Sequence, residues 1–176
     1  MLNLTEKIII HQIKRGDEQA FSQFYNTHQP NIYRFIYFKV SDQEKAQDLT
    51  NETFLKVYKY LKDDDIEISN FRALLFKIAR NLVIDFYRTR RDQVSLEDFP
   101  EIASSIELEE EIDQKIKIEN IKKYLSLVKS EYQETIQLHF FEGLSFSEIS
   151  EIIGESEGNV RIRAHRGIKQ LKKALE

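Results

Sequence analysis

Apolar residues recur at helical spacing through the first ninety residues of the chain. One run covers residues 20–40, with Pro30 as a point where a helix can break, and a second covers residues 49–61. A third begins near Asn70 and places five apolar side chains on one face: Phe71, Leu75, Ile78, Leu82 and Phe86. This spacing predicts three or four amphipathic helices packed as a bundle.

A different combination of signals occurs near the end of the chain. Ser145 and Glu148 form an S-x-x-E capping box, which fixes a helix start just after Gly143. Gly154 stands where a left-handed residue ends that short helix, and Ser156 can cap the next one. The next helix has one apolar stripe: Val160, Ala164, Ile168, Leu171 and Leu175. Together these signals predict a helix-turn-helix.

The opposite side of the last helix is polar and basic. Its residues are Asn159, Arg161, Ile162, Arg163, His165, Arg166, Lys169 and Lys173. This is the layout of a recognition helix in a DNA major groove, where Arg166 and Lys169 would meet base edges, the flanking arginines phosphates, and Ile162 a thymine methyl. A solvated basic face is the alternative for a lone helix. The preceding helix and glycine turn favour DNA.

Charge is unevenly distributed along the 176 residues, whose formal net charge is −4. Residues 1–91 carry a net +3, residues 92–119 a net −8, and residues 120–176 a net +1. Because the acidic stretch also holds Pro100, Ser104 and Ser105, residues 92–107 are predicted to be an acidic linker. We therefore expect an all-α chain of two helical domains, residues 1–91 and 108–176.

Composition excludes several classes of function. The chain has no cysteine, so disulfides and thiolate chemistry are excluded, and its four histidines, His11, His28, His139 and His165, lack the spacing of a metal site. No phosphate loop or serine nucleophile motif occurs. No secretion signal or membrane-length apolar run occurs either. We expect a cytoplasmic protein that is not an enzyme and needs no cofactor.

The third N-terminal helix has an unusual second face. Aromatic and basic residues alternate on it: Phe76, Lys77, Arg80, Ile84, Tyr87 and Arg88. Rings that stack on unpaired bases, interleaved with cations that follow phosphates, suit single-stranded nucleic acid. A middle helix of a bundle whose second face packs on a neighbour is an equally good interpretation of the pattern alone.

Four blocks of sequence stand out together: Gly16–Phe21 (GDEQAF), Ala46–Tyr58 (AQDLTNETFLKVY), Phe71–Asp85 (FRALLFKIARNLVID) and the terminal helix-turn-helix. Taken together they resemble bacterial RNA polymerase sigma factors of the extracytoplasmic-function (ECF) group. Their order and spacing match the family over nearly the whole chain. The resemblance implies a dissociable initiation subunit with a region 2 domain, a linker and a region 4 domain.

The resemblance also implies partners and site residues. The first domain would bind the clamp of the largest polymerase subunit through Asp48, Asn51, Glu52 and Phe54, with Asn51 where the family usually has glutamine. It would open the minus-ten promoter element through Phe76, Lys77, Arg80, Asn81, Tyr87 and Arg88. The last domain would bind the flap of the second-largest subunit and read the minus-thirty-five element. An anti-sigma protein would regulate the chain.

Some positions depart from the family pattern. The loop 62–70, where the family captures a flipped base, is acidic here, and Leu74 replaces a common tryptophan. Ile162 stands where a small serine is frequent. These differences bear on which promoter is read. The competing classes are a conventional helix-turn-helix regulator that binds DNA without polymerase, and a protein-binding adaptor that leaves the basic face unused.

Overall fold

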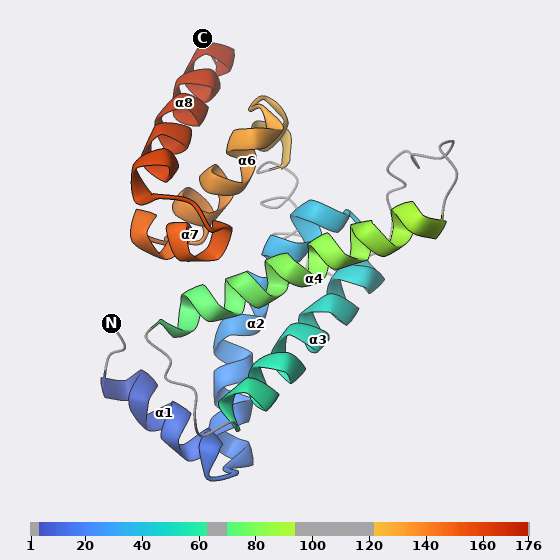
Figure 1. Cartoon of the computed structure of the whole chain (residues 1–176), viewed down its shortest axis with the longest axis vertical. Helices are drawn as coiled ribbons and strands as arrows, with labels where there is room; N and C mark the ends of the chain where they lie inside the picture. The colour runs from blue at the N-terminus through green and yellow to red at the C-terminus, as the bar shows by residue number, and fades with distance from the viewer. Residues whose placement is uncertain (1–3, 63–69, 94–121, 176) are drawn as a thin grey trace, which may run out of the picture. The chain divides into compact units, whose positions relative to one another are not determined.

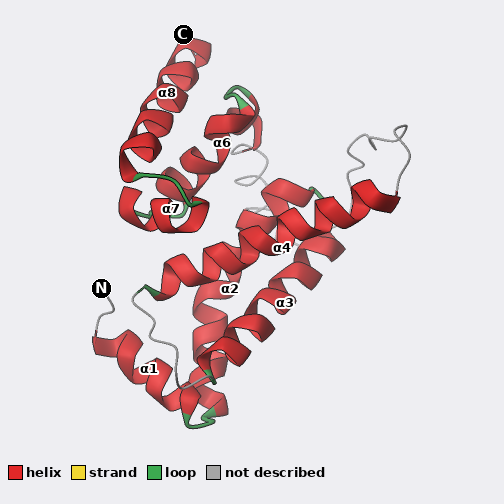
Figure 2. Ribbon diagram, viewed as in Figure 1, coloured by secondary structure: helices red, strands yellow, loops and turns green. Residues whose placement is uncertain are grey.

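The computed structural model describes residues 4–62, 70–93 and 122–175. The chain divides into two compact units, Met1–Gln93 and Val94–Glu176. Within the described residues every regular element is a helix, and short loops join them (Figure 2). The predicted all-α class is confirmed.

Four helices form the N-terminal unit: α1 (Leu4–Lys14), α2 (Glu18–Val40), α3 (Gln43–Leu61) and α4 (Phe71–Gln93). The last three pack against one another, and α1 packs against α2 and α3 (Figure 1). Short side chains set the starts of three helices. Asp17 accepts hydrogen bonds from the first-turn amides of α2, Asp42 does so for α3, and Asn70 for α4.

Aromatic rings dominate the core of this unit. Phe24 meets Phe54 and Phe71 edge to face, with ring centroids 5.8 and 4.5 Å apart. His28, one turn further along α2, packs its ring on Phe24 at 4.8 Å. Burial lowers the pKa of His28, the nearby charge of Arg72 lowers it further, and Glu6 opposes both effects.

Pro30 does not break its helix. Helix α2 runs without interruption from Glu18 to Val40 with Pro30 inside it, so the chain does not break at this possible point. Apolar residues on both sides of it, Phe24 before and Ile32 and Phe35 after, are buried in the core. Pro30 itself is exposed, so water can reach the carbonyl that loses its helical donor. Packing on both sides therefore holds the helix together.

The predicted linker lies largely outside the described residues. Asp92 and Gln93, expected as its first residues, continue α4 instead. The remaining linker residues and the predicted start of the second domain, residues 94–121, are not described. The acidic loop 63–69 is likewise outside the described residues.

Three α-helices and a π-helical turn form most of the described C-terminal unit. They are α6 (Ser130–Ile136), η1 (Gln137–Phe141), α7 (Phe146–Ile153) and α8 (Glu157–Leu175), and residues 122–126 are also helical. Four buried residues form one core cluster, which Phe141, Ile168 and Leu171 cover: Leu125, Val128, Tyr132 and Ile136. In the π turn the Glu142 amide donates to the Gln137 carbonyl at 3.1 Å.

Helix α8 approaches α6 closely at Gly167. A Cβ at this position would lie 2.9 Å from two carbon atoms of Ile136 and 3.2 Å from Cβ of Tyr132. Only a glycine fits this crossing without displacing its neighbours. The sequence pattern did not identify the contact, although a lone glycine inside a strongly helical stretch is a signal for one.

The helix-turn-helix is confirmed in its details. The Ser145 hydroxyl accepts from the Glu148 amide and the Glu148 carboxylate accepts from the Ser145 amide, which completes the capping box at α7. Gly154 ends α7 with φ of 74°, in the left-handed region. The Ser156 hydroxyl then accepts from the Asn159 amide at the start of α8. Val160 and Ala164 are buried as predicted.

Candidate polymerase and nucleic-acid interfaces

The predicted recognition face of α8 is exposed. Asn159, Arg161, His165, Arg166 and Lys169 are all exposed, and Ile162 has 49% of its surface accessible. Arg163 is half-buried at the edge of the face. Lys173, the last residue predicted for this face, is exposed too, so all eight residues are accessible at the surface of α8 and include one apolar group.

Acidic residues hold the flanking arginines of α8. Arg161 forms an ion pair with Glu157 and lies over the Phe146 ring of α7, 4.9 Å from the ring centre. Arg163 forms an ion pair with Glu155. Arg166 and Lys169 have no ion-pair partner among the described residues. The uncompensated positive charge therefore lies in the middle of the face.

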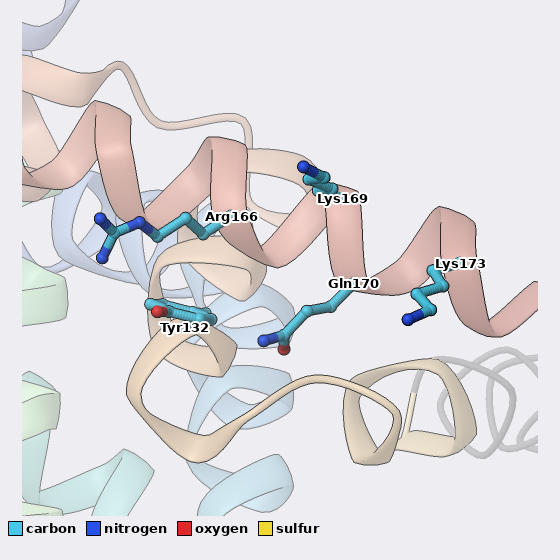
Figure 3. A pocket seen from close by; sticks show the side chains of 5 residues that line it. All are labelled: Tyr132, Arg166, Lys169, Gln170 and Lys173. Atoms are coloured by element: carbon cyan, nitrogen blue, oxygen red, sulfur yellow. The ribbon is translucent and has the colours of Figure 1, made fainter.

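A small groove between α6 and α8 adjoins this charge. It has a volume of about 250 Å³ and is lined by Tyr132, Arg166, Lys169, Gln170 and Lys173. Figure 3 shows the Arg166 side chain extended beside the Tyr132 ring, while Lys169 points to the other side of the helix. The Gln170 side-chain oxygen accepts from the Lys129 amide at 3.0 Å, which ties α8 to the start of α6. An anion in this groove would meet Arg166 first.

Phe76 does not belong to the exposed face of α4, and its predicted place there is wrong. Its side chain is 2% exposed and meets Phe35 edge to face at 5.3 Å, so the ring is part of the core. Helix α4 is covered by both α2 and α3, and this gives it a second buried stripe that the single-face pattern did not include.

The rest of the predicted α4 face is at the surface. Lys77, Asn81 and Arg88 are exposed, Ile84 is 46% exposed, and Arg80 is half-buried. The Tyr87 hydroxyl donates to the Lys39 carbonyl at 2.6 Å, which holds the 40%-exposed ring in place. Arg88 pairs with Asp85 at 3.1 Å. One fixed ring, one apolar side chain and three cations therefore share this surface.

The predicted polymerase-binding face of α3 is also exposed, with one correction. Asp48, Asn51 and Glu52 face solvent, but Phe54 is 2% exposed and packs on Tyr25 at 4.6 Å, so it supports the face from beneath. Both acids pair with lysines of the same helix: Lys45 lies 3.4 Å from Asp48, and Lys56 lies 3.3 Å from Glu52. The charge of this face is therefore compensated locally.

Leu55 is a surface residue that the sequence reasoning missed. It lies three residues after Glu52 and seven after Asp48, on the same side of α3, and 52% of its surface is exposed. The sequence does contain a signal for this residue, because Leu55 is an apolar residue at the helical spacing of the polar residues Asp48 and Glu52. Beside this face an open groove of about 760 Å³ runs between α3 and α4, rimmed by Asp42, Asp48, Glu52 and Asp85.

No group of three or more His, Asp or Glu side chains in the described segments is placed to hold a metal ion. None of the helices in those segments is both long enough and apolar enough to cross a bilayer.

Comparison with known proteins assigns a family to both units. The Sigma-70 region 2 model matches residues 24–93, and the Sigma-70 region 4 model matches residues 118–171. The chain is 32% identical over 161 residues to the RNA polymerase sigma factor SigZ of Bacillus subtilis, with 90% of this chain and 86% of SigZ covered.

More distant relatives belong to the same group. The chain is 27% identical over 172 residues to the ECF sigma factor BldN of Streptomyces coelicolor; 95% of this chain aligns, but it spans only 64% of the length of BldN. A solved structure of the sigma factor RpoE in complex with the anti-sigma factor NepR from Bartonella quintana superimposes with a TM-score of 0.64 at 27% identity, covering 89% of this chain and 97% of RpoE. The chain belongs to the ECF sigma factors of bacterial RNA polymerase and contains regions 2 and 4.

Proposed function

We propose that this chain binds core RNA polymerase and directs promoter-specific transcription initiation. The observation that carries the proposal is the match to Sigma-70 regions 2 and 4, in that order along one chain. Each matched region carries its own exposed, charged helix face. A conventional regulator would need only the helix-turn-helix. That alternative function leaves the match to region 2 without an explanation.

Helix α8 would read the minus-thirty-five element. Arg166 and Lys169 have no ion-pair partner within the described segments and are the candidates for base edges, and the exposed Ile162, one turn before Arg166, is the candidate for apolar contact with a thymine methyl. Arg161 and Arg163 are held by acids at the flanks, which suits phosphate contacts that fix the register.

Helix α4 would hold the opened minus-ten element. Tyr87 offers a ring fixed by its hydrogen bond to α2, and Lys77, Arg80, Asn81 and Arg88 supply donors along the same side of α4. A fixed ring loses little entropy when a base stacks on it, and such stacking contributes about 1–3 kcal/mol per base. Phe76 has no part in this surface because it is buried.

The exposed face of α3 would bind the clamp of the largest polymerase subunit through Asp48, Asn51 and Glu52, with Leu55 among them. The C-terminal unit would bind the flap of the second-largest subunit. The relative RpoE is bound to an anti-sigma factor, and we infer an anti-sigma partner for this chain as well. The proposed activity belongs in the cytoplasm, with core polymerase, and involves no catalytic step by this chain and no cofactor.

Transcription of genomic DNA fragments by core polymerase, with and without this protein, tests the proposal. We expect discrete new start sites that require both components. Tight, sequence-specific DNA binding by the protein alone, with no new start sites, would instead support a conventional regulator.

A further inference from the structure

Three of the residues predicted to bind polymerase are exposed on α3, and Asn51 is the uncharged one among them. A side chain of the neighbouring helix α2 fixes the orientation of its amide. Its Oδ1 accepts a hydrogen bond from the Tyr25 hydroxyl of α2 at 3.0 Å and a second from Nε2 of Gln47 at 3.2 Å. An amide oxygen has two lone pairs, and these two donors occupy both. The amide nitrogen keeps two hydrogens and has no partner among the described residues.

Tyr25 can fix this geometry because its own ring is anchored. The ring lies against Phe54, with centroids 4.6 Å apart, and Phe54 is buried in the core. Tyr25 is itself half-buried, so its hydroxyl reaches the surface from a fixed base. Gln47 supplies the second donor from one turn earlier on α3. The orientation of an exposed amide is therefore set by the core of the domain.

We propose that Tyr25 is a positioning residue for polymerase binding, which orients Asn51 so that its amide N–H groups face the partner. The partner surface then presents a hydrogen-bond acceptor, such as a carbonyl or carboxylate oxygen, opposite Asn51. Cationic groups of the partner suit the flanking carboxylates of Asp48 and Glu52. This proposal rests on the assignment of the α3 face to core polymerase.

Asn51 differs from Asp48 and Glu52 in the kind of partner group that it selects. A carboxylate tolerates any nearby cation, since Coulomb attraction has little directional preference. A fixed amide donor accepts only an oxygen along its N–H direction, because a hydrogen bond weakens steeply when it is misaligned. Asn51 would therefore set the register of the two surfaces more than their affinity. The shorter asparagine, compared with the usual glutamine, suits this role because Tyr25 and Gln47 can hold it.

A double-mutant cycle on the full chain tests the proposal. Affinity for core polymerase is measured for the unaltered protein, Tyr25→Phe, Asn51→Ala and the double variant. We expect Asn51→Ala to weaken binding about two- to tenfold, the range for one net hydrogen bond. Tyr25→Phe should weaken binding by a smaller factor, and it should have no further effect in the Asn51→Ala background.

Two further variants make the test specific. Asn51→Asp keeps an oxygen for Tyr25 and Gln47 but replaces the outward donor with a negative charge, so it should weaken binding more than Asn51→Ala. Tyr60→Phe removes the hydroxyl of an exposed tyrosine on another side of α3 and should leave binding unchanged. Hydrogen exchange of α2 and α3 checks that each variant is folded.

The measurements distinguish a failure of the proposal for Tyr25 and Asn51 from a failure of the proposed function. If Asp48→Ala weakens binding but Asn51→Ala does not, the amide has no role and the inference is wrong, while the proposed function stands. If Tyr25→Phe weakens binding equally in both backgrounds, Tyr25 does not act through Asn51. If the unaltered chain does not bind core polymerase, the proposed function itself fails.

Discussion

Helices α3 and α8 are both 19 residues long, and each buries one side in its own unit and exposes the other. The two helices differ in which of their exposed charged side chains form ion pairs. On α3 the exposed acids Asp48 and Glu52 are paired with lysines of the same helix. On α8 acids pair with the flanking arginines, while Arg166 and Lys169 in the middle have no ion-pair partner in the part of the chain that the structure describes.

The difference matches two kinds of partner. A face with compensated charge has little long-range attraction, so it depends on shape and directed hydrogen bonds, as a protein interface does. A face with uncompensated cations attracts phosphates and releases counterions when it binds DNA. The two faces therefore predict different responses to mutation and to salt.

Removing the central cations of α8 should have the largest effect. Each base-edge contact contributes about 1–3 kcal/mol, so Arg166→Ala combined with Lys169→Ala should nearly abolish initiation at promoters that depend on the minus-thirty-five element. The salt dependence of DNA binding should also become shallower. Transcription of a template series with and without that element, at two salt concentrations, measures both effects. Lys172→Ala, in the last turn, is the matched control. Full activity of Arg166→Ala on the dependent templates would contradict the groove assignment.

The close crossing of α8 on α6 provides the next test. Gly167→Ala places a methyl group 2.9 Å from Ile136 and should destabilise the C-terminal unit by about 1–3 kcal/mol. Gly158→Ala, on the same helix, meets only the Ser156 hydroxyl at 4.0 Å, so it should stabilise the unit by about 0.5–1 kcal/mol.

Hydrogen exchange resolves these two glycine variants by unit, because amides of α2 to α4 report separately from those of α6 to α8. Equal protection in the two variants would show that the α6–α8 crossing relaxes more easily than its geometry indicates.

Asp48→Ala should weaken polymerase binding, by a smaller factor than the loss expected for the α8 double variant. The carboxylate is exposed and already paired with Lys45, and such surface pairs contribute about 0.2–1 kcal/mol. The loss should shrink further as salt is added. Equilibrium binding to core polymerase measures it, with Glu18→Ala, an exposed acid at the start of α2, as control. A loss as large as that of the α8 double variant would remove the contrast between the two faces.

The smallest effect concerns His28, a half-buried residue of α2 whose ring packs near Phe24 and Phe71. Since its pKa is lowered in the folded chain, the unfolded chain binds more protons below the ordinary histidine pKa of 6.5. The stability of the N-terminal unit should therefore fall as the pH falls below 6.5. His28→Gln should flatten this dependence in hydrogen-exchange measurements on α2 to α4. A pH profile that His28→Gln leaves unchanged would show that another group is responsible.

Local signals in the sequence were sufficient for the helix-turn-helix. The capping box at Ser145, the left-handed Gly154 and the Ser156 cap each involve residues within a few positions of one another, so their geometry is set locally. The exposed face of α8 followed because that helix has one buried stripe.

The N-terminal unit was harder to predict, because its helices contact several neighbours. Phe54 and Phe76 were assigned to exposed faces, but α3 and α4 each pack on two or more helices, and this turns a second side of each toward the core. Pro30 was judged by its local propensity, which tertiary packing overrides. The hydrogen bond from Tyr25 to Asn51 joins residues 26 apart and has no local signature.

The π-helical turn at Gln137–Phe141 acts as a one-residue insertion in an otherwise α-helical segment. A chain one residue shorter here could close the same segment with ordinary α-helical bonds, but the residues on one side would rotate by about 100° relative to those on the other. Within the turn, His139 Nδ1 lies 2.7 Å from the Leu144 carbonyl oxygen and Phe140 faces solvent, and such a rotation would change both. If relatives differ in length by one residue at this turn, the side chains on one side of it would rotate to a different part of the surface, and the fold would stay the same.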